Sequence, residues 1–262
     1  MSSMTTAISQ PTPDRVTVRG FDLSTELIGH VTTTEYFYVL LTGERPTPVQ
    51  TKILDACIVS IAEHGLVPSV QVARMTYASG PEALHGAVAA GLLGCGSVIL
   101  GSSDVTGVLL SAIVDDAHAS GRDIATVAHE HVVRLREDGK AVPGVGHPLH
   151  KEEDPRATAL LKLADDLGAT GTHCRALEAV VESMDSVFGR TFPLNVSGVI
   201  PAVLLDVGFP ANAMKGVPLV GRTMSLMAHL LEEVESPIGF GLASAAERAV
   251  IYIGKGTKAG QP

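Results

Sequence analysis

Apolar residues recur every three or four positions along most of this chain, and the strict alternation typical of strands is rare. The apolar runs are also longer than ordinary strands. An apolar rhythm runs through 16–43, and further helices are expected at 53–62, 69–80, 81–94, 104–119, 124–135, 157–167, 173–188, 197–207 and 218–234. The pattern therefore predicts an all-α fold.

Capping and breaking residues set the expected boundaries of these helices. Threonines at 32–34 supply a helix cap before Glu35, and the sequence GERPTP at 43–48 then interrupts the helical pattern. Pro81 suits a first helical position, because its missing N–H would have no helical partner there. The longest loop is expected at 139–157, which contains three glycines and three prolines.

Composition narrows the choice of partners. The 262 residues are 45% apolar, enough to bury the core of one domain or of two closely associated ones. A net charge of −9, without a basic stripe, argues against nucleic-acid binding. The most apolar stretch, 87–101, is short and glycine-rich, so a buried helix explains it better than a membrane span. Residues 1–15 are polar, are expected to be loose and lack an apolar signal core, so we expect a cytoplasmic protein.

Cysteines and histidines give no sign of a metal site. The three cysteines are odd in number and widely spaced, which fits neither a disulfide framework nor a zinc ribbon. The pairs His129-x-His131 and His147-x-x-His150 lack further ligands at a usual spacing. We therefore expect no metal.

Four segments, in order, resemble the citrate synthase superfamily, and within it most closely citryl-CoA lyase and the citryl-CoA lyase module of ATP-citrate lyase. Segment 19–47 resembles the family's N-terminal helical hairpin, and 63–94 resembles its histidine-bearing segment with the apolar helix that follows. GVGHPLHKEEDPRA at 144–157 resembles the glycine–histidine loop. Residues 194–233, which begin LNVSGVIPAVLLD, resemble the closing segment.

This resemblance implies a domain arrangement as well as a fold. The expected parts are a large helical domain (16–100 and 211–262), a small domain carrying the glycine–histidine loop (101–210) and helices packed across a homodimer interface.

The glycine–histidine loop carries the expected acid–base group. His147 matches the histidine that handles the proton of the hydroxyl or carbonyl oxygen, and imidazole suits this task because its pKa lies near neutral pH. Gly144 and Gly146 permit the sharp bend that presents it. Lys151 matches a basic position near the phosphates of coenzyme A. The alternatives are a histidine that satisfies loop backbone and an exposed lysine beside acidic neighbours.

Three further positions match residues that hold carboxylates. Arg156 and Arg222 match carboxylate-binding arginines, whose planar guanidinium groups can bind carboxylates through two parallel hydrogen bonds. His64 matches a histidine that contacts the oxaloacetate or citryl moiety. The alternatives are ion pairs for the arginines and, for His64, a helix C-terminal histidine beside Gly65. His229 is expected in the core or behind the site.

Two positions depart from the family pattern. Ser197 stands in Asn-Val-Ser, where the family has an aspartate that exchanges a proton with the acetyl methyl group. Leu100 stands where citrate synthases have a histidine that stabilises the enolate. The sequence Leu-His-Gly around His85 looks like the family motif that carries this histidine, but it lies at an earlier helical position. Asp206 lies on the opposite side of the helix from Ser197, so it cannot easily replace the missing carboxylate, whereas Asp104 or a bound water could.

The resemblance implies a lyase that cleaves citryl-CoA, or a similar 3-hydroxyacyl-CoA, to an acyl-CoA such as acetyl-CoA and a 2-oxo acid such as oxaloacetate. His147, His64 and Ser197 would form the catalytic group, with coenzyme A as part of the substrate. Two alternatives stay open. One is condensation of the citrate or methylcitrate synthase type, and the other is a degenerate paralogue that only binds coenzyme A or a carboxylate.

Overall fold

The computed structural model describes residues 4–96, 100, 102–146 and 153–254. The chain divides into two compact units. The first unit comprises Met1–Ile61 and Leu100–Pro218, and the second comprises Ala62–Ile99 and Leu219–Pro262. The expected division into a large and a small domain stays a prediction.

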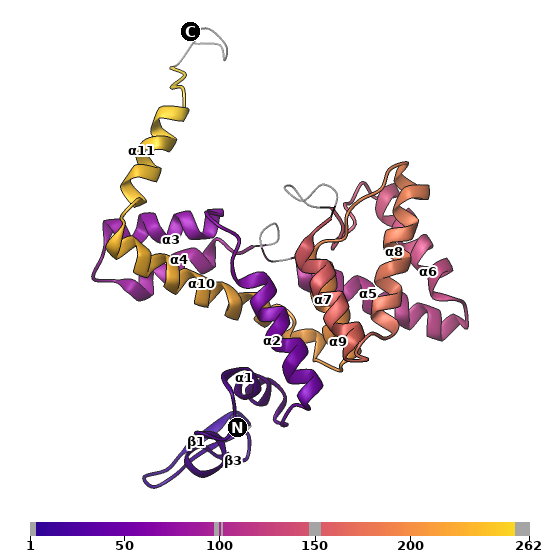
Figure 1. Cartoon of the computed structure of the whole chain (residues 1–262), viewed down its shortest axis with the longest axis horizontal. Coiled ribbons are helices and arrows are strands. Elements are labelled where there is room, and N and C mark those ends of the chain that lie inside the picture. Colours follow the sequence, from indigo (N-terminus) through magenta and orange to yellow (C-terminus); the bar gives the residue numbers. More distant parts are fainter. Residues whose placement is uncertain (1–3, 97–99, 101, 147–152, 255–262) are drawn as a thin grey trace. The chain divides into compact units, whose positions relative to one another are not determined.

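Helices dominate the first unit, which confirms the all-α prediction for its larger part (Figure 1). Its helices are the π-helix η1 (Leu23–Leu27), the α-helices α1 (Thr33–Thr42), α2 (Pro48–Ala62), α5 (Ser102–Ser120), α6 (Ile124–Glu137), α7 (Pro155–Asp166), α8 (Thr172–Phe188) and α9 (Val196–Asp206), and the 3₁₀ helix η2 (Ala211–Ala213). The predicted cap of α1 is present, because Thr32 and Glu35 form a reciprocal capping box.

A small antiparallel sheet precedes these helices, in the order β1 (Ser9–Pro11), β2 (Val16–Val18) and β3 (Phe21–Asp22). The predicted helical hairpin at 19–47 is therefore wrong in its first part. Val18 pairs with Phe21 across a two-residue turn. Both turn residues, Arg19 and Gly20, have positive φ angles (50° and 92°), as in the tight turns that favour hairpins. This local turn chemistry overrides the apolar rhythm.

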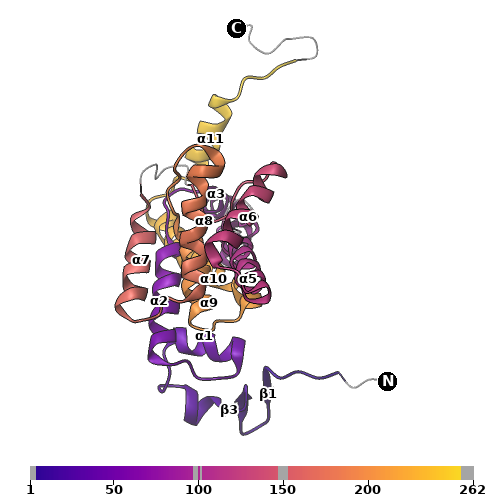
Figure 2. The ribbon, with the colours of Figure 1, turned by 90° about the vertical axis from the view of Figure 1, so that its right-hand side faces the viewer.

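Helix α9 forms the centre of the first unit and packs against α5, α7 and α8 (Figures 1 and 2). It is apolar on all sides, as expected for a fully buried helix. Pro201 lies inside it, and a β-carbon at Gly107 of α5 would lie 3.4 Å from the Pro201 ring. Since proline has no N–H, the carbonyl of Ser197 lacks its usual helical donor.

The second unit consists of α3 (Pro68–Ser79), α4 (Leu84–Leu93), most of α10 (Gly216–Glu235) and α11 (Gly239–Ala249). Its core joins α3, α4 and α10 through Val70, Ala73, Ala87, Leu226 and Leu230. A β-carbon at Gly91 would come within 2.8 Å of Leu226, so glycine allows α4 to approach α10 closely. Pro81 does not begin α4 as predicted. It lies in a turn closed by the hydrogen bond from Ala83 N to the Gly80 carbonyl (3.0 Å).

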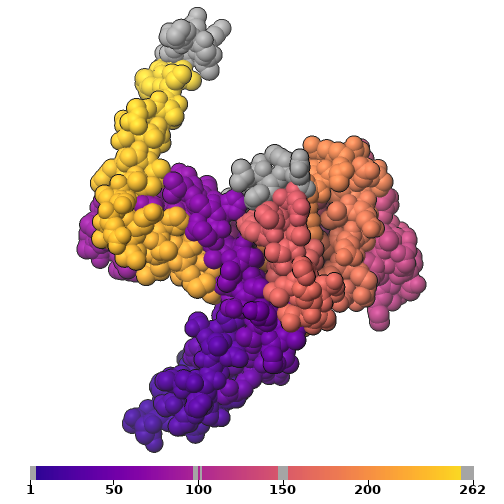
Figure 3. All heavy atoms as spheres, in the orientation of Figure 1, coloured from indigo at the N-terminus to yellow at the C-terminus, as the bar shows by residue number. Residues whose placement is uncertain are grey.

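Helix α11 was not predicted from the sequence. It packs against α3 through its first turn, and most of its other residues are exposed; Figure 3 shows it projecting from α3 and α10 of its own unit. In the described part of the chain, no helix combines the length and the apolar character needed to cross a bilayer.

Candidate functional site

Arg222 is a buried guanidinium without a full set of partners. It lies on α10 and is 2% exposed, yet its Nε and Nη1 atoms are buried without a hydrogen-bond partner in the described residues. Leaving such groups unsatisfied costs on the order of 1–3 kcal/mol each, and more when the group is charged. A side chain of this kind is suited to binding an anion that supplies the missing acceptors.

The charge of Arg222 is only partly balanced. Burial lowers the pKa of the Arg222 guanidinium, and the nearby Cys95 thiol and Glu63 carboxylate oppose this only in part. Because arginine keeps its proton at neutral pH, the side chain is a buried positive charge. A carboxylate ligand would therefore be stabilised strongly at this position.

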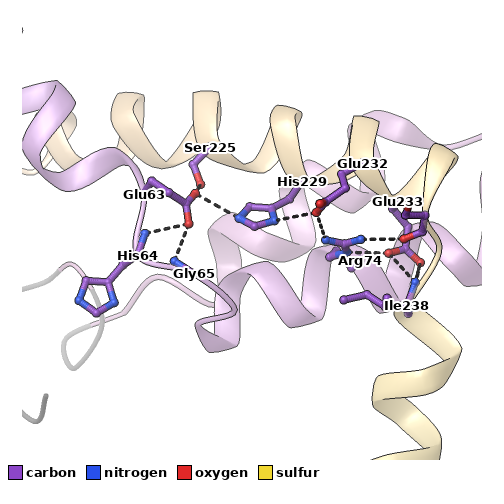
Figure 4. Close-up of polar contacts among 11 residues, drawn as sticks. Glu63, His64, Gly65, Arg74, Ser225, His229, Glu232, Glu233 and Ile238 are labelled. Atoms are coloured by element: carbon purple, nitrogen blue, oxygen red, sulfur yellow. Dashed lines mark hydrogen bonds and ion pairs between the residues drawn. The ribbon is translucent and has the colours of Figure 1, made fainter.

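His64 lies on a turn that a neighbouring carboxylate holds in place (Figure 4). The Glu63 carboxylate accepts hydrogen bonds from the backbone N–H groups of His64 (2.9 Å) and Gly65 (2.5 Å). It also accepts from Ser225 Oγ (2.5 Å) and His229 Nε2 (3.1 Å) of α10. The turn that carries His64 is thus hydrogen-bonded to the helix that carries Arg222.

Sequence reasoning missed Glu63 and Ser225. A signal was present, because Arg222, Ser225 and His229 are spaced by three and four residues and therefore share one face of α10. Burial raises the pKa of Glu63, but hydrogen bonds from Ser225, the Gly65 backbone and His229 outweigh it and hold the pKa below its ordinary value. Glu63 is therefore an anion at neutral pH.

In the first unit, Arg156 forms a two-pronged ion pair with Asp154. Arg156 Nε lies 2.9 Å from Oδ1 and Nη2 lies 2.9 Å from Oδ2 of this fully buried carboxylate. Asp154 also caps α7 and accepts from the backbone N–H of Val196 (3.0 Å), at the start of α9. Burial opposes ionisation of Asp154, but these hydrogen bonds and the guanidinium lower its pKa to about 2. Whether Arg156 also holds a substrate carboxylate stays a prediction.

The glycines that precede His147 lie against the start of α9. Gly146 N donates to the Pro193 carbonyl (2.7 Å), and Asn195 Nδ2 donates to the Gly146 carbonyl (2.6 Å). Asn195 also caps α9 through its hydrogen bond from Gly198 N (3.1 Å). These contacts place the first part of the glycine–histidine loop beside Ser197, which is half-buried.

Several predicted positions lie outside this description or elsewhere in the fold. His147 and Lys151 lie outside the described residues. Leu100 has a φ of 65°, in the left-handed region that leucine rarely adopts. Asp104, at the start of α5, has a buried Oδ1 atom without a partner in the described residues.

Asp206 points away from Ser197, as predicted, and binds the start of α8. Its buried carboxylate accepts from the backbone N–H groups of Gly171 (2.6 Å), His173 (2.8 Å) and Cys174 (3.0 Å). Burial opposes ionisation, but His173 and these N–H groups lower the pKa of Asp206 to about 2. Asp206 therefore caps the start of α8.

The histidine pair at 129 and 131 does not form a metal cluster. His131 Nε2 lies 2.9 Å from a carboxylate oxygen of Asp116. Across the described ranges, no three His, Cys, Asp or Glu side chains come together in a way that could hold a metal ion.

Comparison with known proteins identifies the family. The model for the citrate synthase C-terminal domain matches residues 24–239. The chain belongs to the citrate synthase family. A citryl-CoA lyase structure from Hydrogenobacter thermophilus is 32% identical with a TM-score of 0.84, and the match covers 97% of this chain and 96% of that one. A structure of ATP citrate lyase from Methanothrix soehngenii in complex with citrate and coenzyme A has a TM-score of 0.78 at 19% identity, which shows a shared fold; it covers 100% of this chain and 43% of that one.

Two curated relatives are longer than this chain. Curated relatives from Mycobacterium tuberculosis and Haloferax volcanii, whose names both describe citrate synthases, are 30% and 26% identical over 87% and 76% of this chain. This chain spans 57% and 51% of their respective lengths.

Proposed function

We propose that this member of the citrate synthase family cleaves citryl-CoA, or a similar 3-hydroxyacyl-CoA, to an acyl-CoA and a 2-oxo acid. The observation that carries the proposal is the match to citryl-CoA lyase at 32% identity over almost the whole of both chains. The citrate synthase relatives, in contrast, match over about half of their length. The buried, unsatisfied guanidinium of Arg222 supports an anionic substrate.

The reaction requires one base, one electron acceptor and one proton donor. His147 takes the proton of the 3-hydroxyl group, and the hydroxyl-bearing carbon forms a carbonyl as its bond to carbon 2 of the thioester breaks. The electron pair of that bond passes to the thioester as an enolate. A proton then adds to the enolate carbon, which releases acyl-CoA beside the 2-oxo acid.

The remaining residues hold the substrate. Arg222, Arg156 and His64 bind its carboxylates, which fixes the bond that breaks relative to the base. Lys151 binds the phosphates of coenzyme A in this proposal, as the family resemblance implies. Gly144 and Gly146 shape the loop.

Ser197 and Leu100 replace the two side chains that, as the family resemblance implies, citrate synthases use to form the acetyl enolate. Condensation begins by removing a proton from the acetyl methyl group, and neither a serine hydroxyl nor a leucine can supply that base or stabilise the enolate. General acid–base groups contribute about 10²–10⁴-fold to rates. Cleavage starts from the 3-hydroxyl group, whose proton His147 accepts, and passes through the same enolate, which water can protonate.

The proposed assembly is a homodimer. Helix α10 exposes Met224, Met227, Leu231 and Val234, which follow one another at helical spacing and form a continuous apolar stripe. The stripe is available for a second copy of the chain, consistent with the homodimer that the family resemblance implies.

Two incubations of the purified protein test the function. We expect acetyl-CoA and oxaloacetate from citryl-CoA, and no citryl-CoA or citrate from oxaloacetate with acetyl-CoA. Product in both incubations would favour the condensing enzyme, and product in neither would favour a binding paralogue.

Replacing Ser197 with Asp tests the departure from the family pattern. An unchanged cleavage rate and an unchanged substrate preference in Ser197→Asp would refute a role for this serine.

Arg222 is tested separately from turnover. Replacing Arg222 with Gln should weaken citrate binding at least tenfold, whereas Arg134→Gln on an exposed face of α6 should leave it unchanged. Calorimetric titration with citrate measures both. If the two variants bind citrate with equal affinity, Arg222 does not contribute to the citrate site.

A further inference from the structure

Glu63 is an exposed carboxylate that nevertheless accepts four hydrogen bonds. Its side chain is 54% exposed, so water could satisfy it without help from the protein. Instead, Ser225 and His229 donate from α10, and the backbone N–H groups of His64 and Gly65 donate from its own turn (Figure 4). An exposed carboxylate with this many fixed donors constrains the backbone around it.

We propose that Glu63 is a positioning residue, which with Ser225 and His229 holds the His64 turn in a fixed place along the α10 face that carries Arg222. This inference rests on the proposed function, in which His64 and Arg222 hold the substrate. Glu63 acts through the backbone, because Figure 4 shows the His64 imidazole pointing away from the Glu63 carboxylate.

The turn follows directly on the end of α2, so its backbone N–H groups need acceptors outside that helix. Gly65 has a φ of 70°, in the left-handed region, and α2 ends just before Glu63, at Ala62. The N–H groups of His64 and Gly65 lie beyond the helix, and the Glu63 carboxylate gives both of them an acceptor. Without it, the turn would lose its hydrogen bonds to α10.

His229 lies between the carboxylates of Glu63 and Glu232 and forms a hydrogen bond with the first. Because the Glu63 carboxylate can only accept, Nε2 of His229 carries the proton between them. On the other side of the ring, Nδ1 lies 4.0 Å from Glu232, and Glu232 pairs with Arg74 (2.5 Å). The row of polar side chains thus continues from the His64 turn to Arg74 of α3.

The test combines substrate kinetics with a ligand-binding measurement. Glu63→Ala should lower kcat for citryl-CoA about 10- to 100-fold and weaken citrate binding about tenfold, since small displacements of positioning groups have effects of this size. Ser225→Ala and His229→Ala should each show part of this loss. Ser225→Thr and His229→Gln keep a donor and should recover most of it. Glu130→Ala, which removes a comparable exposed carboxylate paired with Arg122, is the matched control.

A second readout separates this inference from the proposed function. In protein labelled at histidine, the ring signal of His64 should move in Glu63→Ala and stay in place in Glu130→Ala. If the wild-type protein neither cleaves citryl-CoA nor binds citrate, the proposed function fails, and the His64 signal still decides whether Glu63 positions the turn. An unmoved His64 signal, or alanine variants that lower only Tm with unchanged citrate affinity and kcat, would overturn the inference.

Discussion

Gly198 lies against Gly144 so closely that a β-carbon on Gly198 would come within 2.5 Å of the Gly144 carbonyl oxygen. The contact is reciprocal, because a β-carbon on Gly144 would lie 2.8 Å from the Gly198 α-carbon. Only glycine at both positions allows the two backbones to meet in this way. The contact fixes the first part of the glycine–histidine loop against the turn of α9 that carries Ser197.

Gly144→Ala should therefore destabilise the protein more than its backbone conformation alone explains. Gly144 has a φ of 81°, and a left-handed alanine costs about 1–2 kcal/mol. The clash with Gly198 should add about 1–3 kcal/mol. Gly121→Ala is the matched control, since Gly121 has a φ of 65° and no atom within 4 Å of its added β-carbon. Urea unfolding measures both, and equal losses in the two variants would contradict the packing argument.

Asp154 should make stability depend on pH in the acid range. Its folded pKa of about 2 lies below the ordinary value of 3.8, so its contribution is full above about pH 4 and is lost as pH falls through the folded pKa. The contribution is roughly 2 kcal/mol, and about half of it should be lost by pH 3. Unfolding free energies of the wild type and Asp154→Asn at pH 7 and pH 3 measure this.

The difference between the wild type and Asp154→Asn should shrink toward pH 3. Asp166→Asn, at an exposed ion pair with Lys162, should change stability by about 1 kcal/mol or less. If the wild type and Asp154→Asn differ in unfolding free energy by the same amount at pH 7 and pH 3, the ionised form of Asp154 does not stabilise the fold.

The sequence predicted the structural features that depend on residues close together in the chain, such as helices and their caps. The spacing of apolar residues predicted the helices now seen as α3, α5, α6 and α8, and Thr32 with Glu35 predicted the start of α1. The strands β1–β3 are two or three residues long, too short for an alternating pattern to emerge. A closer reading of Arg19-Gly20 as a two-residue turn could have found the hairpin.

Of the candidate site, only the residues that match a family motif could be predicted from the sequence. Arg222, His64 and Ser197 were proposed in this way, and their roles stay predictions. The partners that hold them were not, because Glu63 meets Ser225 and His229 across more than 160 residues of sequence. Asp206 likewise caps α8 from 35 residues beyond Gly171. Such pairings arise from tertiary packing, which a single sequence does not record.

Glu233 should anchor α11. It is 3% exposed, pairs with the buried Arg74 (2.6 Å) and accepts the backbone N–H groups of Ile238 (3.0 Å) and Gly239 (2.7 Å). Glu233→Gln leaves Arg74 without its buried anion, which should cost about 3–5 kcal/mol. Hydrogen exchange over 239–249 should then speed up, while the exposed change Glu247→Gln should leave it as in the wild type. Unchanged exchange in Glu233→Gln would show that other contacts hold α11.

The apolar stripe of α10 should mediate self-association. The exposed Leu231 lies within this stripe, and burying a lysine there in an apolar interface would cost several kcal/mol. We expect the wild-type chain of 27.2 kDa to sediment as a dimer at micromolar concentration, and Leu231→Lys to weaken the dimer at least tenfold. Ala119→Lys adds the same charge at an exposed position of α5 and should leave the dimer intact. Sedimentation equilibrium measures all three, and a wild-type monomer, or a dimer equally stable in both variants, would move the interface away from this stripe.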